Sequence, residues 1–182
     1  MRAYVLCALL TLSLLLTGCA GGEQRADFEK FSEELSEKDS LSFTSELRCE
    51  YDDRTLNFTL EFSGSDGGCS VTVLSPDDIS GLRANLKPGG TELQYEDMIL
   101  DTGELDEYGL SPMSALPCIV KALAGGHPES FWREGSVRMC ELSADDGCTV
   151  RAGFREEDMC PLYAEIISGG RLRVFCKIAG WQ

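Results

Sequence analysis

The sequence predicts a mainly β protein with two helices, folded as an antiparallel half-barrel: an open, curved β-sheet with the helices packed on its concave face. At least nine short segments alternate apolar and polar residues with a period of two, and turn residues separate them. Two further segments carry apolar residues at helical spacing. The apolar face of the sheet exceeds what these helices can cover on a flat sheet, so the sheet should curve around them.

The N-terminus has the pattern of a targeting segment. Arg2 is followed by about 12 apolar or small residues from Val5 to Leu16, a length that suits a signal peptide and is short for a membrane span. The run ends in Leu16-Thr17-Gly18-Cys19, which resembles the bacterial lipoprotein signal. That resemblance implies cleavage before Cys19 and acylation of its sulfur. An ordinary signal peptide or a short membrane anchor is the alternative.

This interpretation sets the expected organisation of the chain. Residues 1–18 are expected to be a lipoprotein signal peptide, residues 19–26 a lipidated N-terminus with a short polar tether, and residues 27–182 a single domain of ordinary size. We therefore expect the protein to be lipid-anchored in the cell membrane, on its extracytoplasmic face.

Two segments are predicted to be helices. Residues 27–38 place Phe28, Phe31 and Leu35 on one narrow apolar stripe among acidic residues. Residues 110–124 begin with Ser111-Pro112, a helix-capping residue followed by proline, and carry a second apolar face. Pro117 leaves two alternatives for this segment, a kinked helix or a turn that leads into a helix beginning at Pro117.

The remaining segments alternate as strands in which one face is buried. Their turns contain Gly, Pro or Asp, which is typical of a meander of antiparallel hairpins. The predicted strands are residues 41–51, 56–62, 69–73, 82–86, 91–95, 98–101, 137–142, 148–154, 162–168 and 171–178.

Charge and cysteine content narrow the function classes. The chain carries a formal charge of −15, and without Arg2 the remaining 15 basic residues face 31 acidic ones, which gives −16 for the mature part. Such a balance repels phosphate backbones, so nucleic acid is not an expected partner. Seven cysteines follow Cys19, a number that cannot pair completely within one chain, and several are in phase with the apolar side of strands. We expect most of them to be free, buried thiols.

No catalytic, metal or cofactor site is predicted. The single histidine, His127, stands in a Gly-Gly-His-Pro segment without a cysteine or carboxylate at ligand spacing, and we interpret it as a turn residue. The Cys-x-x-Cys and Gly-x-Ser-x-Gly motifs are absent. The sequence therefore favours a protein that is not an enzyme.

The order of elements resembles a known family. The lipoprotein signal, the N-terminal helix, the meander containing "YDDRTLNFTLEFSGSDGGCSVTVLSP", the "GLSPMSALPCIVKAL" helix and the last four strands are similar to small Firmicutes lipoproteins with the LolA/LolB/LppX-type lipoprotein-carrier fold. The resemblance implies an apolar half-barrel that shelters acyl chains under its helices. It also implies a gating arginine, for which Arg48 is the nearest candidate by strand position, although its phase points outward.

The candidate ligand-binding residues are the apolar side chains of the inner face of the sheet and of the second helix: Phe43, Leu47, Phe58, Leu60, Phe62, Val71, Val73, Met113, Leu116, Val120, Leu123 and Val174. The leading functional hypothesis is non-enzymatic binding or shuttling of a lipid or acyl chain. The alternative is a cell-envelope adaptor whose half-barrel is filled by its own side chains and which docks another protein, as a germination lipoprotein of this fold does with a cell-wall amidase.

Overall fold

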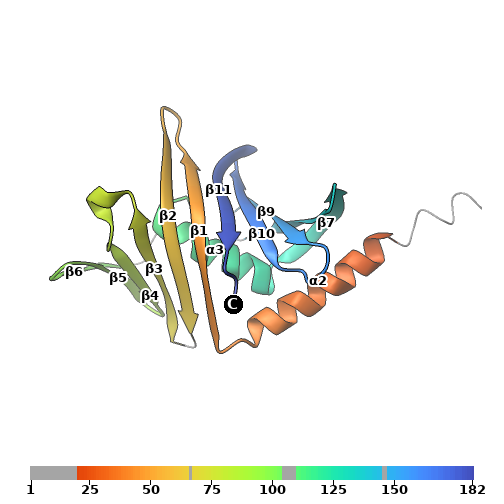
Figure 1. The fold of residues 1–182 in the computed structure, drawn as a ribbon, viewed down its shortest axis with the longest axis horizontal. Helices are drawn as coiled ribbons and strands as arrows, with labels where there is room; N and C mark the ends of the chain where they lie inside the picture. Colours follow the sequence, from red (N-terminus) through yellow and green to blue (C-terminus); the bar gives the residue numbers. More distant parts are fainter. Residues whose placement is uncertain (1–19, 66, 104–109, 145–146) are drawn as a thin grey trace, which may run out of the picture.

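The computed structural model describes residues 20–65, 67–103, 110–144 and 147–182, which form one curved sheet with helices on its inner side (Figure 1). Eleven antiparallel strands follow the order β6-β5-β4-β3-β2-β1-β11-β10-β9-β8-β7, with β6 and β7 at the open edges. The predicted fold class, an open antiparallel sheet with two helices, is confirmed. The signal segment and Cys19 lie outside the described residues.

The strands are β1 (Ser40–Glu50), β2 (Thr55–Ser65), β3 (Gly68–Ser75), β4 (Arg83–Lys87), β5 (Gly90–Tyr95), β6 (Met98–Gly103), β7 (His127–Glu134), β8 (Val137–Ser143), β9 (Cys148–Arg155), β10 (Pro161–Ser168) and β11 (Arg171–Ala179). The helices are α2 (Ala20–Ser36), α3 (Pro112–Gly125) and the short 3-10 helix η1 (Asp77–Ile79).

Strand β7 is the element that alternation did not predict. His127, interpreted as a turn residue, is its first residue, and this interpretation is wrong. None of the residues of β7 is fully buried, because the strand lies at the edge of the sheet. The contrast between its two faces is therefore too weak to produce the apolar and polar alternation on which the prediction depended.

Helix α2 begins at Ala20 instead of residue 27 and ends at Ser36 instead of residue 38. Residues 20–26, predicted to be a tether, are therefore helical. Gln24 is buried, and Arg25 Nη2 donates a hydrogen bond to the Pro128 carbonyl on β7 at 3.3 Å. These contacts hold the first turns of the helix against the edge of the sheet.

Helix α3 begins at Pro112, so the alternative in which the helix begins at Pro117 is wrong. Ser111 caps the helix, because its side chain accepts a hydrogen bond from the Ser114 backbone N–H while the Ser114 side chain accepts one from the Ser111 backbone N–H. Pro117 lies inside the helix, where it removes one backbone donor.

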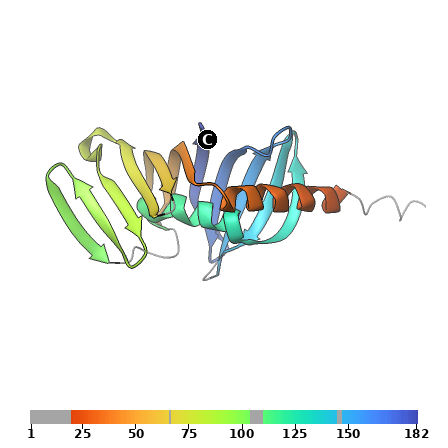
Figure 2. The same cartoon turned by 90° about the horizontal axis from the view of Figure 1, so that it is seen from below.

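Both helices lie across the same face of the sheet (Figure 2). Helix α2 contacts α3 and β7, and α3 contacts β3, β8 and β10. Ser32 Oγ on α2 donates a hydrogen bond to the Ala124 carbonyl on α3 at 2.8 Å, which joins the two helices directly. The helices thus form one layer on the concave side.

Small side chains under this layer let the helices approach the sheet. A buried row crosses four neighbouring strands in register and consists of Cys176, Ala164, Ala152 and Cys140. Larger residues at these positions would hold the helices away from the sheet, because the interior is close-packed.

Candidate functional site

An apolar cavity of about 470 Å³ lies between the ends of α2 and α3 and the strands β1–β4, and it is partly open to solvent. Its floor is a row of residues that face one another across four strands. Leu41 lies opposite Gly64, Gly64 opposite Cys69, and Cys69 opposite Leu86. All four line the cavity. The antiparallel register of four consecutive strands therefore assembles the floor.

Gly64 helps to keep this cavity open. A Cβ atom at this position would lie 3.1 Å from the ring of Phe62 and 3.9 Å from the Leu41 carbonyl oxygen, so it would point into the space that the floor encloses. The backbone of Gly64 does not require glycine, because its φ lies outside the left-handed region. What glycine supplies here is the empty volume of a missing side chain.

The predicted ligand-binding residues divide into three groups. Phe62 and Val120 line the cavity, from β2 and α3 respectively. Phe58 and Met113 are half-buried and pack against the core. The remaining eight are buried members of the core: Phe43, Leu47, Leu60, Val71, Val73, Leu116, Leu123 and Val174. The centre of the half-barrel is thus filled by the side chains of the protein, while the end near β1–β4 holds an open cavity.

A series of aromatic contacts connects helix α2 to the cavity wall. Phe31 lies with its ring centroid 6.4 Å from that of Trp181, Trp181 stacks on Phe43 at 4.9 Å, and Phe43 stacks on Phe62 at 5.0 Å. Phe62 is held in this stack on one side and faces the cavity on the other. The wall is therefore rigidly supported, because each ring is fixed by its neighbour.

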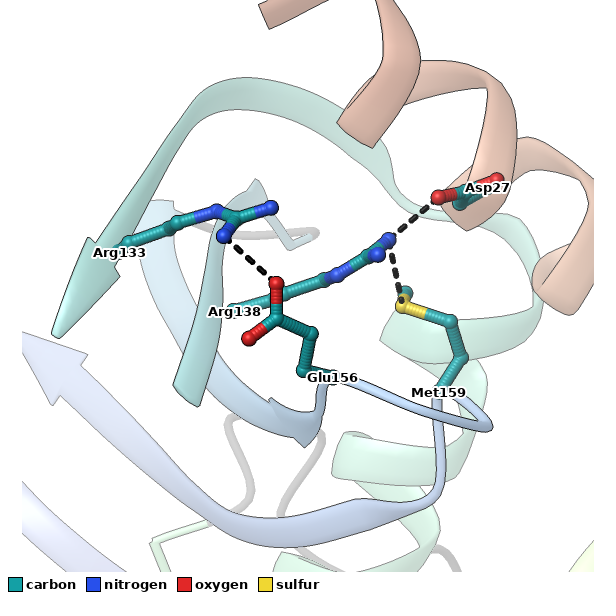
Figure 3. A network of polar contacts seen from close by, with 5 residues as sticks. All are labelled: Asp27, Arg133, Arg138, Glu156 and Met159. Carbon is teal, nitrogen blue, oxygen red and sulfur yellow. Dashed lines mark hydrogen bonds and ion pairs between the residues drawn. The ribbon is translucent and has the colours of Figure 1, made fainter. Parts of the chain in front are cut away.

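At the other end of the half-barrel, Arg138 joins the sheet to α2 (Figure 3). Its Nη1 atom donates hydrogen bonds to the Asp27 carboxylate and to Met159 Sδ, the latter at 3.9 Å, and its side chain is 15 % exposed. Nearby, Arg133 Nη1 and Glu156 Oε1 are 2.6 Å apart. The sequence did not single out Arg138, because an isolated arginine in a strand gives no sign of what it will meet across the fold.

Arg48, the candidate for the gating arginine that the family resemblance implies, lies on the outer face. Its Nη2 atom is 3.1 Å from Glu50 Oε1, and its guanidinium carbon lies 5.5 Å from the ring centroid of Phe175. Both groups of the Arg48–Glu50 pair are partly exposed. Among the described residues, Arg138 and not Arg48 links the sheet to α2.

Three lysines border the cavity, and no pattern in the sequence predicted them. Lys38 follows the end of α2, Lys87 ends β4 and Lys121 projects from α3, and all three line the cavity. Lys87 Nζ also lies 3.1 Å from Glu92 Oε2. No local pattern could have predicted this cluster, because the three residues come from distant parts of the chain.

The buried thiols are expected to be unreactive, because burial keeps them protonated. Burial raises the pKa of Cys49 to about 11 and that of Cys140 to about 12. Burial also raises the pKa of Cys176 to about 12, although the hydrogen bond with Ser45 Oγ at 2.9 Å opposes the shift. Cys49, Cys69, Cys140, Cys160 and Cys176 are free thiols, as expected for most of the cysteines. Protonated thiols are poor nucleophiles and metal ligands.

Within the described ranges, no group of three or more His, Cys, Asp or Glu side chains is placed to hold a metal ion. In the same residues, no helix is both long and apolar enough to cross a membrane.

Comparisons with solved structures define the class of fold. The chain is similar to a LolA superfamily protein from Nitrosomonas europaea, with a TM-score of 0.51 and 13% identity over 87% of this chain and 92% of that one. It is also similar to a conserved protein from Thermus thermophilus (TM-score 0.52, 8% identity, 87% and 86% covered) and to a DUF1329 family protein from Desulfovibrio piger (0.51, 6%, 87% and 92%). The chain has the LolA-like fold, which confirms the expected resemblance. No protein-family model and no curated protein matches the chain.

Proposed function

We propose that this protein is a membrane-anchored bacterial lipoprotein that binds or shuttles an apolar ligand, a lipid or an acyl chain, without catalysing a reaction. The observation that carries the proposal is the open cavity over the Leu41–Gly64–Cys69–Leu86 floor. Its volume of about 470 Å³ falls within the range of roughly 300 to 1,000 Å³ that ligand sites occupy. The similarity to a LolA superfamily protein supports the same function.

The cavity lies between the sheet and the two helices. The floor belongs to the rigid sheet, whereas the roof consists of the end of α2 and the face of α3. Burial of apolar ligand surface is worth roughly 25 cal/mol per Å², so a single chain in this cavity gains substantial binding energy without a polar partner. The volume favours one small ligand over a bulky acylated protein.

Membrane anchoring forms the second part of the proposal. The lipoprotein signal that ends at Cys19 supports attachment through a diacylglyceryl group on the cysteine sulfur. Two or three acyl chains anchor a protein stably, because each buried CH₂ contributes about 0.8 kcal/mol. The acyl chains would hold the domain at the extracytoplasmic face of the cell membrane.

The test is uptake of the neutral fluorescent probe N-phenyl-1-naphthylamine, together with native mass spectrometry of protein purified without detergent. The wild-type domain should bind the probe with a stoichiometry of one and should carry lipid. Gly64→Leu fills the cavity from the floor and should weaken probe binding at least fivefold. Gly22→Leu introduces the same side chain at an exposed position of α2, where a Cβ atom meets nothing within 4 Å, and should have no effect.

A second variant keeps this test decisive if Gly64→Leu lowers the yield of folded protein. Val120→Asp places a charge on the roof, from helix α3, and leaves the sheet unchanged. A wild-type domain that binds neither lipid nor probe would overturn the proposal.

A cell-envelope adaptor is the second candidate function, and one observation favours it. Met98, Ile99 and Leu100 on the edge strand β6 are 66%, 69% and 62% exposed. Unpaired strand edges with apolar side chains are sites at which other chains dock. In that case Ile99→Ser should abolish capture of one stoichiometric envelope protein, while Gly64→Leu should leave that capture intact. Lipid-bearing protein that captures no partner would remove this candidate.

A further inference from the structure

We infer that the ligand of the cavity is an anionic amphiphile, with one acyl chain over the apolar floor and a carboxylate or phosphate headgroup among Lys38, Lys87 and Lys121 at the mouth. This inference rests on the proposed function and adds the chemical class of the headgroup. The observation behind it is the distribution of charge around the cavity.

The chain contains only five lysines, Lys30, Lys38, Lys87, Lys121 and Lys177, and three of them line this one cavity. The chain also contains 31 acidic residues, yet none of the described residues that line the cavity is Asp or Glu. Asp39 follows Lys38 in the sequence but is not a lining residue. A molecule with a net charge of −15 thus carries a local positive site where its apolar cavity opens.

Lysine suits such a mouth for two physical reasons. Its long apolar stem can lie along the hydrophobic wall while the ammonium group stays in water. The ammonium is also a flexible point charge that can follow a headgroup of variable shape. The three lysines come from the segment that follows α2, from β4 and from α3, so three different parts of the fold contribute a lysine to the cavity.

The existing partner of Lys87 does not prevent this role. Its contact with Glu92 joins two side chains that are 59% and 47% exposed. Exposed ion pairs contribute about 0 to 1 kcal/mol, so the ammonium can exchange this partner for a ligand headgroup at little cost. Elsewhere on the molecule, the excess of acidic residues repels anions, which makes the lysine-lined mouth the favoured point of entry.

The experiment compares two competitors of equal chain length, tetradecanoate and tetradecanol, which displace N-phenyl-1-naphthylamine from the wild-type domain and its variants. The test variant is Lys38→Gln/Lys121→Gln. The matched control is Lys30→Gln/Lys177→Gln, which makes the same change in net charge with lysines outside the cavity, paired with Glu34 and Glu46.

Wild-type protein should bind tetradecanoate more tightly than tetradecanol. The test variant should weaken tetradecanoate binding about tenfold and leave tetradecanol within twofold, whereas the control should leave both within twofold. The preference for tetradecanoate should also shrink as salt rises, because the Debye length falls from about 10 Å at 0.1 M to about 3 Å at 1 M.

Three outcomes would overturn the inference. Equal loss in the test and control variants would mean that net charge alone acts. Equal binding of both competitors, unchanged in the test variant, would leave the apolar carrier function intact and remove the anionic headgroup. Vesicles of phosphatidylglycerol are tested in a separate binding assay. If the test variant loses binding to these vesicles but binds soluble tetradecanoate as the wild type does, the lysines contact the membrane and not the ligand. A wild-type domain that takes up no probe would instead remove the proposed function itself.

Discussion

Arg138 on β8 donates a hydrogen bond to the carboxylate of Asp27 on α2, across 111 residues of sequence (Figure 3). The Arg138 side chain is 15% exposed, and its Nε atom is buried without a hydrogen-bond partner among the described residues. If Asp27 is lost, the mostly buried guanidinium therefore gains little hydration in place of the lost ion pair. This ion pair holds the N-terminal half of α2 against the sheet, at the end opposite the cavity.

Removal of this charge pair should loosen α2. Asp27→Asn leaves the Arg138 guanidinium half-buried without a counter-charge, and we expect a loss of roughly 1 to 2 kcal/mol, because Asp27 itself is partly exposed. Urea unfolding at neutral pH measures this loss, and hydrogen exchange should show faster exchange in α2 than in β1.

The control for this variant is Glu29→Gln, which disrupts the exposed pair in which Arg25 Nη1 lies 4.0 Å from Glu29 Oε1. Its expected cost is below about 0.5 kcal/mol. Equal effects of the two variants would contradict the role assigned to Arg138.

Gly153 on β9 supports the outer face of the sheet. A Cβ atom at this position would lie 2.6 Å from the ring of Tyr163 and 3.0 Å from Val137 Cγ1. Tyr163 cannot move away freely, because it stacks on Phe175 with centroids 5.9 Å apart. Gly153→Ala should therefore destabilise the protein by about 1 to 3 kcal/mol, as overpacking does. Thermal unfolding measures the effect.

Two further variants test whether the contact between the added Cβ atom and Tyr163 causes the loss of stability. Gly22→Ala on the exposed side of α2 should stabilise slightly, because alanine is a better helix former than glycine and nothing lies within 4 Å of the added atom. Combining Gly153→Ala with Tyr163→Ala should cost less than the sum of the single variants, because the ring that obstructs the Cβ atom is gone. Full additivity would show that strain elsewhere causes the loss.

Much of this architecture follows from the sequence by elementary rules. Strands with one buried face can be predicted from the alternation of apolar and polar residues, as in β2, where Leu60 and Phe62 face the core. Ser45 interrupts that pattern in β1, because it is a buried polar residue whose hydroxyl is satisfied by Cys176 Sγ. The first turns of α2 escaped prediction because Gln24, their buried residue, is polar.

The candidate site was harder to predict than the fold. The sequence predicted a ligand site from apolar inner-face residues, but most of these residues fill the core, since the residues that leave a cavity are those with small side chains, such as Gly64. A cavity leaves no recognisable pattern in the sequence. The lysine cluster depends on three elements that meet only in the folded chain, as Arg138 and Asp27 do.

The buried thiols should make stability fall at alkaline pH. Cys49, Cys140 and Cys176 have pKa values of about 11, 12 and 12 in the folded protein, against an ordinary value of 9.0. Above pH 9 the unfolded chain loses protons that the folded protein retains, so the free energy of unfolding decreases as pH rises toward 11 to 12. Urea midpoints at pH 8 and pH 10 should show this decrease.

The variant Cys176→Ala should reduce that alkaline decrease, because it removes one of the titrating groups. In native protein at pH 8, iodoacetamide should modify Cys49, Cys140 and Cys176 only after unfolding, since the thiolate is the reactive form. Rapid modification of Cys176 in the folded protein would contradict its burial.

Acylation of Cys19 predicts where the protein fractionates. Wild-type protein expressed with its signal should remain with the membranes, and its intact mass should show an N-terminus at Cys19 that carries acyl chains. Cys19→Ala should release the chain into the aqueous fraction or leave its signal uncleaved. The unfolding temperature of the domain should stay unchanged, because α2 is held to the sheet through residues such as Gln24 and Arg25. Cys7→Ala is the matched control and should retain the acylated form.

Two outcomes would contradict acylation of Cys19. A mature N-terminus at any other residue would show that the segment is an ordinary signal peptide. Membrane retention of Cys19→Ala as a cleaved chain would show that something other than lipid on this cysteine holds the protein at the membrane.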